Sequence, residues 1–190
     1  MAAPALALTS CPECGVENAL DHNFCKHCGH TLKDDLKVYI DLGHANPERT
    51  RDRCLEMVNT YPNDARAHFA LGLAYYHLGQ AGNAARAFER VITIDDGYAA
   101  AHFHLALCHY RSGRMGECVA SARRAIAHNP SSAPAHFRLA IALFHLGKLE
   151  DAAQSFRQTL EVDPDYVIAL YHLGVIQERL SDVDGAIDCF

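Results

Sequence analysis

The 190-residue sequence has no tryptophan, no long apolar run and no excess of positive charge. A membrane-spanning helix needs about 20 apolar residues, so we expect no membrane insertion. The formal net charge of −6 disfavours nucleic acid and anionic lipid as default partners. A G-x-G-x-x-G loop, a P-loop, a Ser/His/Asp set that can be placed and a convergent pair of carboxylates are also missing. We therefore expect no catalytic residue and no enzyme activity.

Cysteine, by contrast, is abundant, with 8 in the chain. Four of these residues form two C-x-x-C pairs, Cys11 with Cys14 and Cys25 with Cys28. Such pairs are typical of metal ligands in a reducing compartment, which favours a cytoplasmic protein. Four thiolates form a closed tetrahedral site for one structural Zn²⁺. No coordination position is then open for water, so zinc-based hydrolysis is not expected.

Residues 11–32 resemble the short zinc ribbon found near the N-termini of prokaryotic proteins. The segment contains CPxCG, then Asn18, Phe24, CxxCG and Leu32, and the resemblance implies two small β-hairpins around the metal. Acidic residues outnumber basic ones here, so protein docking or capping is a stronger role for the ribbon than nucleic-acid binding. Ahead of it, residues 1–10 are expected to be a disordered leader, because no basic residue precedes their apolar stretch as in a signal peptide.

The rest of the chain repeats with a period of 34 residues. Three units span 65–98, 99–132 and 133–166, and each contains the triplet AHF near its start. Residues 167–190 match about two-thirds of a fourth unit, and 33–64 match a degenerate, capping helical hairpin. Apolar residues at steps of three and four predict two amphipathic helices per unit.

The helix ends can also be placed. Gly79, Gly113 and Gly147 occupy one position of the repeat and are expected to end the first helix of each unit. Asn46-Pro47-Glu48 is a good helix start, with Asn as the cap and Pro in the first turn.

A helix–turn–helix unit of this length resembles the tetratricopeptide repeat. The matching positions include Leu71, Gly72, Tyr75, Ala84 and Phe88, with equivalents in later units, although His68, His102 and His136 stand where the family often has Trp. The resemblance implies a mostly α, right-handed α-solenoid behind the small β zinc ribbon. It also implies that positions 5, 9, 12 and 13 of the first helices line a concave groove. The candidate partner-binding residues are Phe69, Leu73, Tyr76, His77, Phe103, Leu107, Tyr110, Arg111, Phe137, Ile141, Phe144, His145 and Tyr171.

The missing chemistry and the repeats together predict a non-enzymatic scaffold that binds a protein helix or peptide. For position 9 an interhelical core role is an equal alternative. Phe and Leu at positions 5 and 9 exclude the Lys/Asn clamp with which some members of the family hold a chaperone C-terminus.

Two alternatives stay open. One is a nucleic-acid-associated factor that uses the ribbon, since residues 99–132 carry four Arg against one Glu. The other is a regulatory region of a longer enzyme, because Phe190 falls inside an expected helix. An open solenoid end would also allow self-association.

Overall fold

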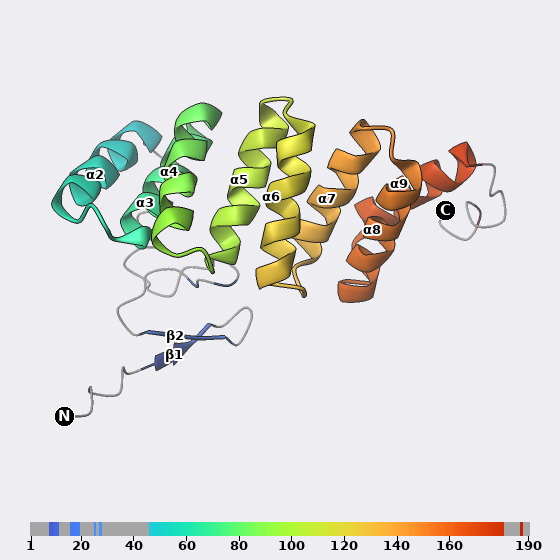
Figure 1. Ribbon diagram of the computed structural model, residues 1–190, viewed down its shortest axis with the longest axis horizontal. Coiled ribbons are helices and arrows are strands. Elements are labelled where there is room, and N and C mark those ends of the chain that lie inside the picture. The colour runs from blue at the N-terminus through green and yellow to red at the C-terminus, as the bar shows by residue number, and fades with distance from the viewer. Residues whose placement is uncertain are drawn as a thin grey trace. The chain divides into compact units, whose positions relative to one another are not determined.

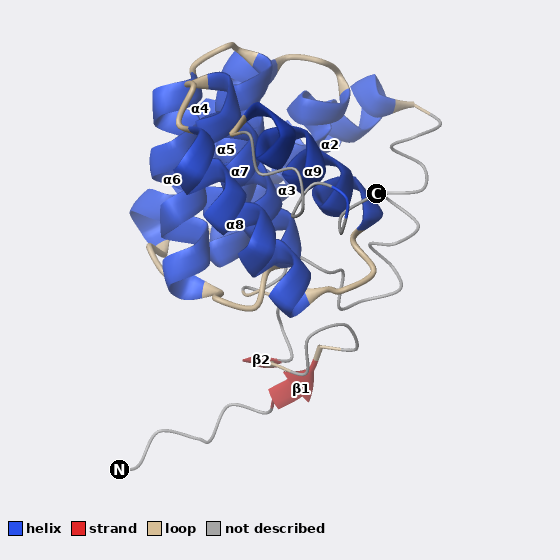
Figure 2. Cartoon of the chain, turned by 90° about the vertical axis from the view of Figure 1, so that its right-hand side faces the viewer, coloured by secondary structure: helices blue, strands red, loops and turns tan. Residues whose placement is uncertain are grey.

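A computed structural model of the chain describes residues 8–11, 16–19, 25, 27, 46–180 and 187. Within these residues there are eight helices and two short strands (Figure 2). The mostly α fold expected from the sequence is therefore confirmed. The chain divides into two compact units, unit 1 (residues 1–105) and unit 2 (residues 106–190).

The strands of unit 1 form an antiparallel hairpin around the first C-x-x-C pair. β1 (Leu8–Ser10) pairs with β2 (Glu17–Ala19), with Thr9 opposite Asn18. The expectation of a disordered leader up to residue 10 is corrected here, because its last three residues form β1. Residues 1–7 and the expected second hairpin lie outside the described residues, apart from Cys25 and His27.

The helices of unit 1 follow the expected boundaries (Figure 1). They are α2 (Pro47–Thr60), α3 (Ala65–His77), α4 (Ala81–Ile94) and the first part of α5 (Ala99–Arg111). The predicted start of α2 is confirmed, because the Asn46 side chain accepts a hydrogen bond from the Arg49 backbone N–H at 3.0 Å and Pro47 occupies the first turn. α2 packs on α3. It is the second helix of the degenerate repeat at 33–64, of which residues 33–45 lie outside the described residues.

Unit 2 continues the same pattern with α6 (Met115–His128), α7 (Ala133–His145), α8 (Leu149–Val162) and α9 (Val167–Arg179). Each of these helices packs on the next one (Figure 1). The first helices of successive repeats, across both units, begin at Ala65, Ala99, Ala133 and Val167, which reproduces the sequence period. Of the fourth repeat, residues 181–186 and 188–190 are outside the described part.

The turn inside each hairpin depends on glycine. Gly79, Gly113 and Gly147 have φ angles of 75°, 73° and 73°, a left-handed conformation that strains residues with a Cβ. Each accepts this conformation directly after the first helix of its repeat, as predicted.

The helices approach closely because small residues face large ones. In unit 1 the fully buried Phe88 ring lies against Gly72. In unit 2, buried Ala140 and Ala152 share a core with Phe156 and Leu139. No helix in the described part of the chain is both long and apolar enough to cross a bilayer.

Candidate partner-binding site

The cysteines predicted to bind zinc are described only in part. Cys11 directly follows β1, and its backbone N–H donates to the Val16 carbonyl at 3.0 Å, which closes the loop of the hairpin. Cys11 and Cys25 are buried and are not joined in disulfides. Cys14 and Cys28 lie outside the described residues. The four-cysteine ligand set therefore stays a prediction.

The predicted groove residues of unit 1 divide into core and surface. Phe69 is fully buried between Phe88 at 5.5 Å and Tyr98 at 5.0 Å, measured between ring centroids. Leu73, Tyr76 and Phe103 are half-buried, and His77 is exposed. The prediction that Phe69 contacts a partner is corrected, because the second helix and the last residue of its own repeat cover the ring.

The same correction applies at position 9 in the later repeats. Leu107 and Ile141 keep only 9% and 7% of their surface exposed, so they have the interhelical core role that the sequence left open. Phe137 has ring contacts equivalent to those of Phe69, with Phe156 at 5.7 Å and Tyr166 at 5.0 Å, but it is only half-buried. Tyr171, at the same position of the last repeat, is 57% exposed.

The sequence did not single out position 6 of the repeat, which the structure places in the packing between repeats. In unit 1 the His104 ring stacks on Phe88 at 5.3 Å and 20°, and burial, with a smaller effect of His77, lowers the pKa of His104 to about 4. In unit 2 the His172 ring stacks on Phe156 at 5.5 Å and 8°. Burial, followed by the charge of His145, lowers the pKa of His172. A signal was available in the sequence: each of these histidines follows its phenylalanine by 16 residues.

In unit 2 a set of six side chains connects α5, α7 and α9, and we call it the arginine–aromatic ladder. It consists of Tyr110, Arg138, Phe144, His145, His172 and Arg179. The Arg138 guanidinium lies 4.6 Å from the centroid of the Tyr110 ring, and the Arg179 guanidinium lies 5.0 Å from that of Phe144. The Tyr110 hydroxyl and His145 Nε2 are 3.3 Å apart.

The ladder is accessible to a partner. Tyr110, Arg138, Phe144 and His172 are half-buried, while His145 and Arg179 are exposed. Arg111, the remaining predicted contact in unit 2, is exposed beside Tyr110 in the sequence. Half-buried aromatic and arginine side chains are the composition found at the centres of protein interfaces.

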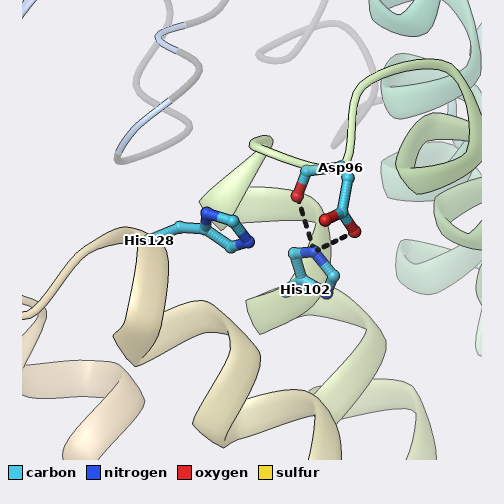
Figure 3. Close-up of side chains that lie close together, drawn as sticks. All are labelled: Asp96, His102 and His128. Carbon is cyan, nitrogen blue, oxygen red and sulfur yellow. Dashed lines mark hydrogen bonds and ion pairs between the residues drawn. The ribbon is translucent and has the colours of Figure 1, made fainter.

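The histidines at position 4, where the tetratricopeptide repeat often has Trp, connect the first helix of each repeat to the loop before it. The Nε2 atoms of His68, His102 and His136 lie 2.9, 2.9 and 2.8 Å from the backbone carbonyls of Pro62, Asp96 and Pro130. Figure 3 shows this contact for His102, together with an Asp96 carboxylate oxygen 3.6 Å away. Because a carbonyl only accepts hydrogen bonds, Nε2 must carry the proton, and each histidine ties its helix to the preceding loop.

Three family models match the chain. The description "Anaphase-promoting complex, cyclosome, subunit 3" covers residues 78–159, "TPR repeat" covers 142–181 and "Tetratricopeptide repeat" covers 52–99. No curated protein matches the sequence.

Several solved structures share the fold. A crystal structure of MamA is 21% identical with a TM-score of 0.72, and the match covers 74% of this chain and 82% of that one. YrrB, described as a TPR protein with an unusual peptide-binding site, is 19% identical with a TM-score of 0.69 and coverages of 80% and 79%. The first TPR of Spaghetti (RPAP3), bound to the HSP90 peptide SRMEEVD, is 24% identical with a TM-score of 0.60 and coverages of 62% and 93%.

These identities are too low to carry more than the fold. The comparisons show tetratricopeptide repeats at residues 52–99 and 142–181. The 34-residue period and the helical hairpins of each unit agree with this.

Proposed function

We propose that the chain is a non-enzymatic scaffold that binds a helix or peptide of a partner protein on the first helices of its repeats. The observation that carries this proposal is the arginine–aromatic ladder, in which Tyr110 and Phe144 keep part of their rings at the surface. Two of the fold neighbours, YrrB and the RPAP3 repeat, are described as peptide-binding, which supports the same use of the fold here.

The corrected burial reduces the binding face to fewer residues than the sequence suggested. Phe69 in unit 1 and Leu107 and Ile141 in unit 2 are buried in the helix packing of their own units, so they do not contact a partner. Contacts with a partner then fall to Tyr76 and Phe103 in unit 1 and to the ladder in unit 2.

A selection of peptides from a random display library tests this function, because it does not require the partner to be identified first. We expect the full chain to enrich related peptides, and we expect Phe103→Ala and Tyr110→Ala to lose them. Tyr61→Ala is the matched control, because Tyr61 is 62% exposed and lies outside the first helices. Enrichment that survives both groove substitutions would rule out this face, and a library that yields no peptide would count against the function.

The same proposal includes a structural zinc ribbon at residues 11–32, held by Cys11, Cys14, Cys25 and Cys28. Support comes from the β1–β2 hairpin around the first pair and from the burial of Cys11 and Cys25. A segment of this size buries too little apolar surface to fold alone, so zinc would supply most of its folding free energy. The ribbon then serves as a cap or as a second docking surface.

A further inference from the structure

Charge is distributed unevenly over the helices of unit 2. The first helices, at residues 106–111, 133–145 and 167–179, contain Arg111, Arg138 and Arg179 but only one acidic residue, Glu178. The second helices, α6 and α8, contain four acidic residues and three arginines. In a chain with a net charge of −6, the helices that carry the ladder are therefore net positive.

Two of these arginines have no carboxylate partner among the described residues. Arg138 and Arg179 each contact an aromatic ring there instead, Tyr110 for the first and Phe144 for the second. Arg66 in unit 1 shows the usual alternative, with its Nε atom 2.8 Å from an Asp64 carboxylate oxygen. Charge that a protein leaves unneutralised on a candidate binding face is available for a ligand of opposite charge.

Arg138 also has a buried donor without a partner. Its Nε atom is buried and makes no hydrogen bond, whereas the side chain as a whole is only half-buried. Part of the Arg138 residue is therefore exposed to solvent although Nε is not. Buried polar atoms without partners are rare in native proteins, and each one calls for a functional or structural reason.

The sequence of the preceding repeat distinguishes Arg138 from the histidines at the same position of the repeat. At both interfaces where position 6 is a histidine, its ring stacks on the phenylalanine 16 residues earlier, as His172 does on Phe156. The residue 16 positions before Arg138 is Ala122, which offers no ring. The guanidinium lies instead over Tyr110, on the face proposed to bind the partner.

A guanidinium that lies over an aromatic ring can also bind a carboxylate. The ring contact occupies one side of the guanidinium, and N–H groups that point away from the ring can donate hydrogen bonds to a ligand. The arginine loses less freedom on binding, because it is already held. Tyr110 and Phe144, beside the two cations, supply apolar surface for neighbouring side chains of the ligand.

We propose, on the basis of the scaffold function above, that unit 2 binds an acidic peptide segment that also contains aliphatic residues. Side-chain carboxylates of the segment pair with Arg138 and Arg179, and its aliphatic side chains lie against Tyr110 and Phe144. The carboxylates come from within the segment, so a free C-terminus is not needed. The net charge of −6 favours a peptide over a nucleic acid, although a phosphate also complements arginine.

Fluorescence anisotropy with the full chain tests this proposal. The probe is a labelled peptide of about 12 residues that alternates Glu with Leu, with both termini blocked, and spans about 40 Å when extended. A peptide with Gln at each Glu position is the neutral control, and a single-stranded oligonucleotide of similar length is the phosphate control. We expect binding of the acidic peptide that weakens between about 50 mM and about 300 mM salt.

The substitutions are Arg138→Gln and Arg179→Gln, each expected to weaken binding of the acidic peptide about tenfold or more through the loss of a charge-assisted hydrogen bond. Arg138→Lys, which keeps the charge without the fork, should recover part of the loss. Arg157→Gln is the matched control, since Arg157 is exposed on α8, and it should bind normally. Circular dichroism melts separate lost binding from lost folding.

The outcomes distinguish this proposal from the scaffold function. Equal binding of the Glu and Gln peptides overturns the charge proposal and leaves the scaffold function intact. Absence of all peptide binding, here and in the library selection, overturns both. Tighter binding of the oligonucleotide than of the acidic peptide makes phosphate the ligand and overturns the peptide proposal. An effect of Arg157→Gln equal to that of Arg138→Gln indicates a nonspecific charge effect and also overturns it.

Discussion

The interface between α3 and α4 has no room for a side chain at Gly72. A Cβ atom there would lie 2.6, 2.8 and 2.9 Å from three atoms of the Phe88 ring, Cε1, Cζ and Cδ1. Real Cβ contacts do not come so close, so Gly72→Ala must displace the ring. Phe88 is fully buried, and Phe69 and His104 pack against it at 5.5 and 5.3 Å. The displacement therefore spreads to two further rings.

Two effects of Gly72→Ala oppose each other. Alanine stabilises a helix interior by about 1 kcal/mol relative to glycine. Overpacking a well-filled core costs about 1–3 kcal/mol, and the rings around Phe88 leave it few ways to relax. We therefore expect a net destabilisation of about 1–2 kcal/mol, which is the opposite of what helix propensity alone predicts.

Gly82 provides the matched control. It lies in the first turn of α4, and a Cβ built there meets no atom within 4 Å. Only the propensity effect then applies, so Gly82→Ala should stabilise the protein by about 0.5–1 kcal/mol. The two substitutions make the same chemical change and should shift the urea midpoint in opposite directions.

A double-mutant cycle identifies the cause of the loss at Gly72. Phe88→Ala alone should cost about 3–5 kcal/mol through the cavity it leaves. In that background Gly72→Ala should become neutral or stabilising, because the repeat at 99–132 contains alanine at both equivalent positions, Ala106 and Ala122. Hydrogen exchange of α3 and α4 checks that the change is local, since repeat arrays need not unfold in one step. If Gly72→Ala is as stabilising as Gly82→Ala, the steric argument is wrong.

Three further predictions concern the metal, the buried imidazole and the repeated histidine. Elemental analysis should find one zinc per chain, and Cys11→Ser should lose it. Cys54→Ser should keep the zinc, because Cys54 is buried in α2. A metal-free wild type would refute the site. Burial lowers the pKa of His104 from 6.5 to about 4, so the unfolded chain protonates this imidazole at a higher pH than the folded chain does. The stability that is present above pH 6.5 is therefore lost as the pH falls towards 4. The loss should reach about 2–3 kcal/mol in urea titrations, and it should be smaller in His104→Leu. His136→Leu leaves the Pro130 carbonyl without its donor and should lower the free energy of unfolding by about 1–3 kcal/mol, whereas an unchanged midpoint would show that the contact contributes nothing.

Local features of the fold could be predicted because they depend on single residues. The positive φ of Gly113 requires a residue without a Cβ, and the cap of α2 requires a side chain such as Asn46. The repeat period placed Gly79, Gly113 and Gly147 correctly, and the Asn-Pro-Glu sequence placed the start of α2. The zinc ligands cannot be assessed in the same way, because Cys14 and Cys28 lie outside the described residues.

The binding face could be predicted only in part, because periodicity identifies a helix face but not what covers it. Phe69 and Tyr76 lie on the same first helix, yet Phe69 is fully buried and Tyr76 is half-buried. The difference arises from Tyr98, whose ring packs on Phe69 from the end of the repeat. That contact joins residues far apart in the sequence and depends on how the chain returns after the second helix.

Position 6 escaped the repeat analysis for the opposite reason, since its residue type varies along the chain. It is Ala70, then His104, Arg138 and His172, which is typical of an unconstrained surface position. The variation becomes regular once each residue is compared with the one 16 positions earlier: the histidines follow phenylalanine and Arg138 follows Ala122. Where the earlier repeat supplies a ring, position 6 closes the core between repeats; where it supplies only a methyl group, position 6 is left with a cation that lies over Tyr110 on the binding face. The absence of a ring at position 122 thus accompanies the charge that, in our proposal, selects an acidic ligand in the next repeat.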